Sequence, residues 1–467
     1  MPKSWRLLLY RPELIILTAL AALTRFWGLF QPNAIVFDEV YFKTYAGDYL
    51  TGSYYFDPHP PLGKLLLGGL AYLFHLSGPA VAGTDPAVVL RLLPALAGTL
   101  IIPVFYILLR QLKASRAVAA LGALLLLLDN ALLVESRFIL IDSMLILFGL
   151  TAITLYLAAR RRQGWPRWRF MAAAAFCAGL AASTKWTGLA ILGIIGLAWF
   201  VEYPPLRTAR RRFLTEGATL LVIPALVYVS VFAVHFHFLT RTGQGDAFMS
   251  QRFQSTLIGS PYYDPHAKLS FIGKFVDLNR AMHDAENSLR GATHPYGSKW
   301  DTWPLMQRDV YYWQGPSLAN GRQGNIYLLG NPIIWWGILV TLILGALAYA
   351  YQPGRFRRYS GVWLLLGVAY LANFLPFSQI DRVMFLYHYL YAFIFSLAAA
   401  VLALAVMTGW DQPSTKFWHF SSRQSMLIYI GVATAALAGF CYFAPLSYGW
   451  PLSQADLMHH IWLPTWR

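Results

Sequence analysis

The sequence predicts an all-α polytopic membrane protein, and three observations support that prediction. Hydrophobic residues make up 57% of the chain, and charged residues make up only 12%. The mean hydropathy is +0.48, which lies outside the range of soluble globular proteins. Apolar runs of about 20 residues, the length that crosses a bilayer, recur along the whole chain. We therefore treat residues 1–467 as a single membrane-embedded domain.

About eleven apolar segments are candidate membrane spans. The first, Leu14 to Phe30, lacks a small-residue cleavage site, so we expect it to remain as a span. Cys177 and Cys441 lie within such segments, which favours buried thiols over a disulfide or a Cys-based metal site. The segments begin near Glu13, Ala87, Ala117, Phe138, Phe170, Gly188, Gly217, Ile333, Gly361, Met384 and Met426.

Clusters of Lys and Arg fall on every second connection between these segments. By the positive-inside rule they predict a cytoplasmic N-terminus and an extracytoplasmic C-terminus. The formal net charge of +16 therefore indicates topology in a lipid bilayer, and we expect no nucleic-acid partner. The clusters are Lys3, Arg6 and Arg11; Arg110, Lys113 and Arg116; Arg160, Arg161, Arg162, Arg167 and Arg169; Arg207, Arg210, Arg211 and Arg212; Arg355, Arg357 and Arg358; and Lys416 and Arg423.

Two connections on the outer side are large, residues 31–86 and residues 237–332. In the second, the apolar residues from Lys268 to Leu289 recur at helical spacing, which predicts a helix lying in the membrane interface. The aromatic residues from Tyr296 through Trp313 are typical of an interfacial belt. Neither loop has the composition of a separate soluble domain.

The first outer loop carries adjacent acids, Asp38 and Glu39, a few residues beyond the first span. A partly dry cavity at this depth raises the basicity of a carboxylate, which suits a general base. The alternative is that both acids cap a short helix beginning at Val40. Further on, His59 and Lys64 flank a rigid Pro-Pro turn directly before another apolar run, so we expect both at the rim of the membrane.

The predicted topology brings further polar residues to the same outer face. Basic side chains there oppose the positive-inside bias, so each requires a partner, and an anionic headgroup would serve all of them. Ordinary alternatives remain: Arg137 could pair with Glu135 or Asp142, and Lys185 could extend to the interface. His388 could be a core histidine. The residues at the ends of the spans are Arg91, Glu135, Arg137, Asp142, Lys185, Arg382 and His388.

A set of short motifs, in chain order from the first outer loop to the tenth span, resembles the protein O-mannosyltransferase family. A lone Asp-Glu pair would be weak evidence, whereas an ordered set of this extent is specific. The motifs are Phe37 to Val40 (FDEV), Tyr55 to Lys64 (YFDPHPPLGK), Ser136 to Ser143 (SRFILIDS), Lys185 to Leu189 (KWTGL), His294 to Ser298 (HPYGS), Trp303 to Met306 (WPLM), Leu329 to Pro332 (LGNP) and Phe385 to Tyr389 (FLYHY).

The resemblance implies a GT-C type architecture and the inverting transfer of mannose from polyprenyl-phosphate mannose to Ser or Thr of proteins during export. By motif it implies that Asp38 and Glu39 are the acidic catalytic pair and that Arg91 and Arg137 belong to the active-site cavity. Eukaryotic members carry a soluble β-trefoil domain between the seventh and eighth spans. This loop lacks one, so the chain resembles bacterial members, and we expect a multi-pass protein of the bacterial plasma (inner) membrane.

We expect several cations to neutralise the departing lipid phosphate, because fixed charges in a low-dielectric cavity stabilise charge strongly. Their number argues against a required cofactor, although Asp38, Glu39 or Asp57 could hold a Mg²⁺ ion. The donor-binding candidates are Arg91, Arg137, Lys185, Arg382, His388, His59 and Lys64, and the other cavity candidates are Asp57, Asp142, His294 and Trp303.

Three alternatives stay open. A related lipid-phosphate glycosyltransferase could use another sugar, or a lipid or glycan acceptor. A transporter for a charged lipid or sugar phosphate could line its pathway with the same cations, although no inverted repeat is evident. A membrane-anchored assembly protein would leave the buried polar residues without a chemical reason.

Overall fold

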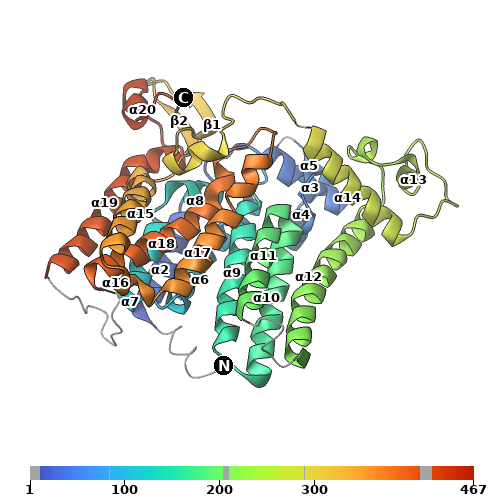
Figure 1. The fold of residues 1–467 in the computed structure, drawn as a ribbon. Helices are drawn as coiled ribbons and strands as arrows, with labels where there is room; N and C mark the ends of the chain where they lie inside the picture. The colour runs from blue at the N-terminus through green and yellow to red at the C-terminus, as the bar shows by residue number, and fades with distance from the viewer. Residues whose placement is uncertain (1–10, 84, 203–209, 289, 411–422, 467) are drawn as a thin grey trace.

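The computed structural model describes residues 11–83, 85–202, 210–288, 290–410 and 423–466. Helices dominate it, and each of the eleven expected apolar segments coincides with one (Figure 1). These helices are α2 (Pro12–Phe26), α6 (Leu92–Gln111), α7 (Arg116–Leu127), α9 (Asp142–Arg160), α10 (Gly164–Thr184), α11 (Leu189–Glu202), α12 (Arg210–Phe238), α15 (Pro332–Tyr351), α17 (Ser360–Ala372), α18 (Leu390–Thr408) and α19 (Arg423–Tyr448).

Seven helical stretches in the described ranges are long and apolar enough to cross a membrane. They contain α6, α9, α12, α15, α17, α18 and α19. The chain is thus a multi-pass membrane protein. The helices α2, α7, α10 and α11 do not meet the same combination of length and hydropathy, so eleven spans stays a prediction.

The bundle is organised around α9 and α18, which are its most buried long helices. Helix α9 packs against α6 and α10, while α18 packs against α7, α15 and α17. By contrast, α12, α15 and α19 lie at the periphery and expose large apolar side chains such as Leu221, Ile343 and Leu437. Exposed apolar faces of this extent are expected where a helix contacts lipid.

Three of the predicted basic connections meet at one end of the bundle, whereas Lys3, Arg6, Arg207 and Lys416 of the other clusters lie outside the described residues. Glu13 at the start of α2 forms an ion pair with Arg116 at 2.7 Å, and Lys113 donates to the carbonyl of Arg358 at 3.4 Å. Arg161 likewise donates to the carbonyl of Gln111. The connections after the second, fourth and eighth segments therefore share one face, as alternating topology requires. Which compartment this face contacts stays a prediction.

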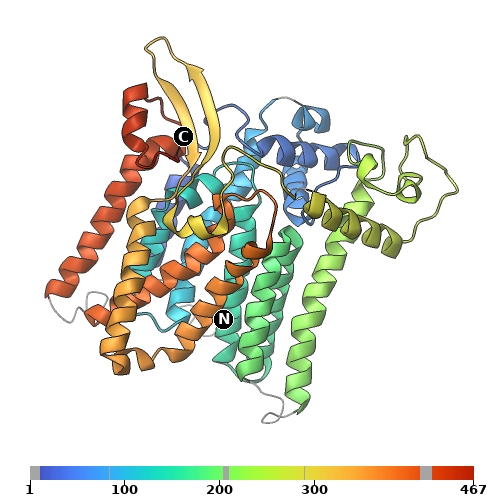
Figure 2. The same ribbon diagram turned by 45° about the horizontal axis from the view of Figure 1, so that its top comes forward.

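The two large outer loops form a roof over the opposite end (Figure 2). The first contributes α3 (Glu39–Thr51), α4 (Leu62–Leu73) and α5 (Gly78–Ala82), and the second contributes α13 (Gln251–Gln254) and α14 (Phe271–Ser288). Tyr54, Phe253 and Leu278 belong to one buried cluster that joins the loops. Helix α14 also exposes Ile272, so it presents an apolar outer face as an interfacial helix would.

A β-hairpin in the second loop was not expected from an all-α reading of the sequence. β1 (Val310–Ser317) pairs antiparallel with β2 (Gln323–Leu328), and Tyr311 lies opposite Tyr327. Aromatic residues favour strands as well as membrane interfaces, which is why the two interpretations compete in this segment. Trp303 and Tyr312 are buried in the core, so these two side chains do not belong to an interfacial belt.

Candidate active site

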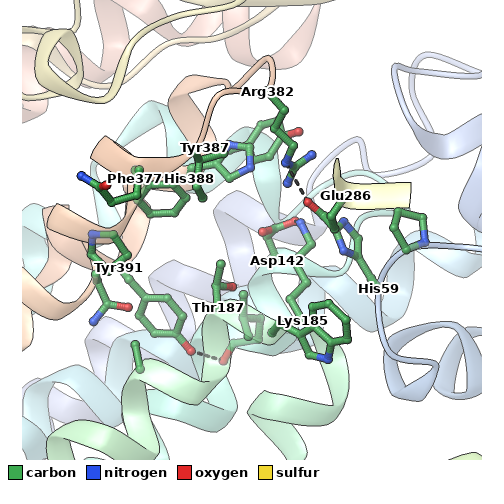
Figure 3. A pocket seen from close by; sticks show the side chains of 18 of the residues that line it. His59, Asp142, Lys185, Thr187, Glu286, Phe377, Arg382, Tyr387, His388 and Tyr391 are labelled. Atoms are coloured by element: carbon green, nitrogen blue, oxygen red, sulfur yellow. Dashed lines mark hydrogen bonds and ion pairs between the residues drawn. The ribbon is translucent and has the colours of Figure 1, made fainter. Parts of the chain in front are cut away.

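A cavity of about 550 Å³ lies beneath the roof, and its lining comes from five separate parts of the chain (Figure 3). The first outer loop supplies His59, the start of α9 supplies Asp142, and the turn after α10 supplies Lys185. The remaining wall consists of α14, which supplies Glu286, and the segment from Pro376 to Tyr391. The cavity therefore collects polar residues that lie far apart in the sequence.

Two ion pairs form between residues that line this cavity. The Lys185 ammonium lies 2.6 Å from the Asp142 carboxylate, and the Arg382 guanidinium lies 2.8 Å from Glu286. Figure 3 shows the Arg382 and Glu286 side chains meeting, with a dashed line between them. Lys185 also lies over the ring of Tyr387, 5.3 Å from its centroid. Each cation has one acidic partner and further N–H donors, so an entering anion could be bound by both.

Asp38 lies beside the Lys185–Asp142 ion pair, although it is not among the residues that line the cavity. It occupies the position before α3, but its side chain makes no capping hydrogen bond, which removes the capping alternative for this acid. Burial raises the pKa of Asp38 to about 6; the negative charges of Asp142 and Asp57 act in the same direction, and Lys185 opposes them. A carboxyl with this pKa is ionised at neutral pH and is a stronger base than an ordinary aspartate.

Glu39 is held in a different way from its neighbour. Its two oxygens accept hydrogen bonds from Arg91 Nε at 2.7 Å and Arg91 Nη2 at 2.8 Å. They also accept from the backbone N–H groups of Val36 and Ile139, both at 2.9 Å. Glu39 and Arg91 are fully buried. This carboxylate therefore ties the first outer loop to the segment before α9 and has no vacant position for a substrate proton.

Arg91 and Arg137 both donate hydrogen bonds to backbone carbonyls. Arg91 donates to the carbonyls of Leu29, Pro32 and Ala34, which fixes the chain just before the acidic pair. Arg137 donates to the carbonyls of Thr24, Arg25, Trp27 and Gly28, where α2 ends and leaves acceptors unpaired. Neither arginine lines the cavity, and Arg137 pairs with neither Glu135 nor Asp142 among the described contacts. This placement does not support a donor-binding role for them.

His59, Lys64 and Asp57 form a rigid corner of the first outer loop. Asp57 accepts from Lys64 Nζ at 2.7 Å and from the backbone N–H of His59 at 2.8 Å. Of the three, only His59 lines the cavity beneath the roof. Burial and the charges of Lys185, Lys64 and Arg382 lower the pKa of His59 well below its ordinary value, so its imidazole is neutral at pH 7.

The other candidates from the second half of the chain have separate positions. His388 lines the cavity and stacks on Trp303, with ring centroids 6.0 Å apart and planes 8° apart. Trp303 is buried behind it and donates to the Ser298 hydroxyl at 2.8 Å. His294 is exposed, does not line the cavity and packs in a T-shaped arrangement with Phe385, with ring centroids 5.1 Å apart.

Sequence reasoning missed the contact that holds the Asp38 backbone. Phe37 adopts φ 49°, a left-handed conformation that costs a residue with a Cβ about 1–2 kcal/mol. Its ring stacks on Tyr312 of β1 at 4.1 Å, and its N–H donates to the Tyr312 carbonyl at 3.1 Å. The Tyr312 hydroxyl in turn donates to Glu135 at 2.8 Å. No periodic or motif signal connects positions so distant in the sequence.

The acids of the first loop are not gathered into one cluster in the described part of the chain, and a Mg²⁺ ion stays an untested prediction. Among the described residues, no group of three or more His, Cys, Asp or Glu side chains is close enough to hold a metal ion. Glu39 and Asp57 are already occupied by Arg91 and Lys64. We therefore derive no step through a metal.

Solved structures of similar fold define the class of the protein. The S. cerevisiae protein O-mannosyltransferase Pmt1-Pmt2 complex bound to the sugar donor matches with a TM-score of 0.86 at 20% identity, over 97% of this chain and 92% of that chain. ArnT from Cupriavidus metallidurans bound to undecaprenyl phosphate matches with a TM-score of 0.57 at 16% identity, over 96% and 77%. The fold is that of the GT-C membrane glycosyltransferases.

The chain belongs to the protein O-mannosyltransferase family. Residues 15–240 match the family described as dolichyl-phosphate-mannose-protein mannosyltransferase, and residues 271–466 match the C-terminal four-transmembrane region of protein-O-mannosyltransferase. Protein O-mannosyltransferase 1 of Drosophila melanogaster is 38% identical over 334 residues, which cover 67% of this chain and 36% of that protein. Dolichyl-phosphate-mannose–protein mannosyltransferase 4 of Candida albicans is 33% identical over 71% of this chain and 45% of that protein. The chain thus spans less than half the length of these relatives.

Proposed function

We propose that this protein transfers mannose from a polyprenyl-phosphate mannose to a Ser or Thr hydroxyl of a protein acceptor, with inversion at the anomeric carbon. The observation that carries the proposal is the Asp38 carboxylate, which has no capping partner and a pKa raised to about 6, beside a cavity containing Lys185 and Arg382. Membership of the protein O-mannosyltransferase family supports the same substrates.

In the proposed step, the acceptor oxygen attacks the anomeric carbon as the bond from that carbon to the phosphate oxygen breaks. Asp38 takes the hydroxyl proton, and the lipid phosphate leaves from the opposite face, so one displacement gives one inversion. Lys185 and Arg382 stabilise the charge that develops on the phosphate, because they can exchange part of their contact with Asp142 and Glu286 for it. His388 and neutral His59 supply further hydrogen bonds within the cavity.

The different roles that we assign to Asp38 and Glu39 follow from their contacts. Glu39 accepts four hydrogen bonds from protein groups, so proton transfer to it would break the Arg91 pair that orders the loop. Asp38 has no such commitment among the described contacts. We therefore assign the base to Asp38 and a positioning role to Glu39.

The decisive experiment incubates the purified protein with polyprenyl-phosphate mannose and a Ser/Thr peptide and detects mannosylated peptide by mass spectrometry. Asp38→Asn should abolish the product, and Asp284→Asn, which alters an exposed acid on α14, should leave it unchanged. Parallel reactions with a polyprenyl-phosphate glucose donor, or with a lipid acceptor, separate this proposal from related glycosyltransferases. Product with only those substrates would overturn it.

We further propose that the roofed end faces the extracytoplasmic side of a bacterial plasma membrane, where exported chains emerge. The basic end then lies in the cytoplasm, in accordance with the positive-inside rule. In a background with Cys177 and Cys441 replaced by serine, Ala319→Cys at the tip of the hairpin should react with an impermeant thiol reagent in intact cells. Gln163→Cys should react only after the membrane is opened, and the reverse pattern would refute this orientation.

A further inference from the structure

A second cavity, of about 760 Å³, opens between α9, α11 and α17 at the basic end of the bundle. Helix α9 begins at Asp142 beside the candidate active site and ends at Arg160 beside this second cavity. Its 19 residues separate the two sites by about 28 Å along the helix axis. The two cavities are therefore distinct, and the argument below does not depend on the proposed transfer reaction; only the leaflet that it names rests on the orientation proposed above.

The walls of this second cavity are apolar and open to the surroundings of the bundle. Leu197 and Val201 of α11 and Leu364 of α17 line it and are also well exposed. Such side chains on a spanning helix contact hydrocarbon rather than water. The shape suits a flexible apolar chain that enters from the bilayer.

The mouth of the cavity carries an excess of positive charge. Lys113, Arg160 and Arg161 line it together with one acid, Glu202, which pairs with Arg160 at 2.6 Å. Burial and the like charges of Arg110 and Arg160 lower the pKa of Arg161, which reports a crowded group of cations. Lys113 and Arg161 contact only backbone carbonyls among the described residues.

The backbone at Lys113 places this residue just past the end of α6. It has φ 70°, in the left-handed region that is common directly after a helix. The Ala114 N–H donates to the Leu109 carbonyl at 3.0 Å, so the turn is a hydrogen-bonded helix C-cap. The conformation leaves the exposed Lys113 side chain at the cavity mouth.

We propose that this cavity binds an anionic phospholipid of the cytoplasmic leaflet, with its phosphate on Lys113 and Arg161 and an acyl chain along Leu197, Val201 and Leu364. Basic pockets between spanning helices bind acidic headgroups by charge complementarity. The apolar wall directly below the cations distinguishes this arrangement from a site for a free anion.

The test uses the full-length protein in detergent, with native mass spectrometry and thermal unfolding on titration with phosphatidylglycerol or phosphatidylcholine. Wild type should retain phosphatidylglycerol and gain thermal stability from it, with little effect of phosphatidylcholine. Lys113→Gln with Arg161→Gln should weaken phosphatidylglycerol binding roughly 25-fold, at about 1 kcal/mol per cation near the surface.

Arg169→Gln is the matched control, because Arg169 is an exposed cation at the same end but does not line the cavity. Leu364→Trp tests the apolar wall without altering charge and should lower lipid retention while unfolding normally in lipid-free detergent. Equal binding of phosphatidylcholine, equal stabilisation by inorganic phosphate alone, or undiminished lipid binding in the double variant would each overturn the proposal.

Discussion

Two groups of charged residues lie at the roofed end of the bundle, and they differ in how much of their bonding capacity the protein itself uses. Around Glu39, Arg91 and Arg137, the hydrogen bonds join buried carbonyls, backbone N–H groups and one carboxylate. Around the cavity, Lys185 and Arg382 each pair with one acid and face an open volume. The first group fixes the chain, whereas the second is equipped to bind a ligand.

This difference explains why sequence patterns could not separate the two groups. A basic residue at the outer end of a span requires a partner in both cases. Whether that partner is a carbonyl of another helix or a ligand depends on where α2 ends relative to Arg137, which only the fold determines. The comparison also separates adjacent acids, because Asp38 and Glu39 belong to different groups.

The largest expected effect comes from exchanging the two acids for amides. Asp38→Asn should lower transfer by roughly 100-fold or more, the scale of a positioned general base, and leave thermal stability near that of wild type. Glu39→Gln should lower the free energy of unfolding by about 3 kcal/mol or more, because it leaves the Arg91 charge buried without its counterion.

Activity assays and thermal unfolding in detergent measure both effects. A matched variant, Asp284→Asn, controls for removal of an exposed acid from the same face. If Asp38→Asn were as destabilised as Glu39→Gln, the two acids would share a structural role and the comparison would fail.

Substituting the two buried arginines, Arg91 and Arg137, should have a different effect from substituting the two cavity cations, Lys185 and Arg382. Lys185→Gln and Arg382→Gln should lower kcat/KM for the lipid donor by about 10- to 100-fold, since each removes a charge positioned for the leaving phosphate. Arg91→Gln and Arg137→Gln should instead lower the unfolding temperature, because they leave buried carbonyls unpaired. Donor kinetics that change equally in all four variants would contradict this division.

Much of the fold was available from the sequence, because long apolar periodic segments dictate spanning helices. The helical state of the eleven apolar segments follows from hydropathy, and charge predicts the three basic connections found at one end, whereas a count of eleven spans stays a prediction. The site was predicted less completely. Lys185, Asp142, Arg382, His388 and His59 do line one cavity, whereas Glu286, which pairs with Arg382, was missed. Its position on an exposed amphipathic helix resembles that of an ordinary solvated acid.

The pH dependence tests the environment of Asp38. Because its pKa is raised from 3.8 to about 6, the basic form is lost as the pH falls through 6. The rate should therefore drop about tenfold between pH 7 and pH 5, where an ordinary aspartate would remain ionised. Lys185→Gln should move the midpoint upward and Asp142→Asn should move it downward, since these charges act in opposite directions on Asp38. A midpoint near pH 4 in wild type would show that a different group is the base.

The smallest effect should come from removing one hydroxyl group from the contact that holds the backbone beside Asp38. Tyr312→Phe keeps the ring that stacks on Phe37 and the carbonyl that accepts its N–H, but it removes the hydroxyl that donates to Glu135. Losing that hydrogen bond should cost about 1 kcal/mol of stability and lower kcat by roughly fivefold. Tyr312→Leu also removes the stack, so Asp38 becomes less well positioned and kcat should fall at least tenfold further.

A positioning role predicts that kcat falls while KM for the donor and the pH midpoint near 6 stay close to wild type in both Tyr312 variants. If the contact had only a structural role, both variants would unfold at a lower temperature, but kcat would not fall further in Tyr312→Leu than in Tyr312→Phe. Phe37→Gly separates the two, because glycine relieves the left-handed strain at φ 49° but abolishes the ring contact. We expect this variant to unfold at a temperature no lower than that of Tyr312→Leu and to lose a similar share of kcat. Full activity in Phe37→Gly would mean that the stack on Tyr312 stabilises the loop and does not orient Asp38.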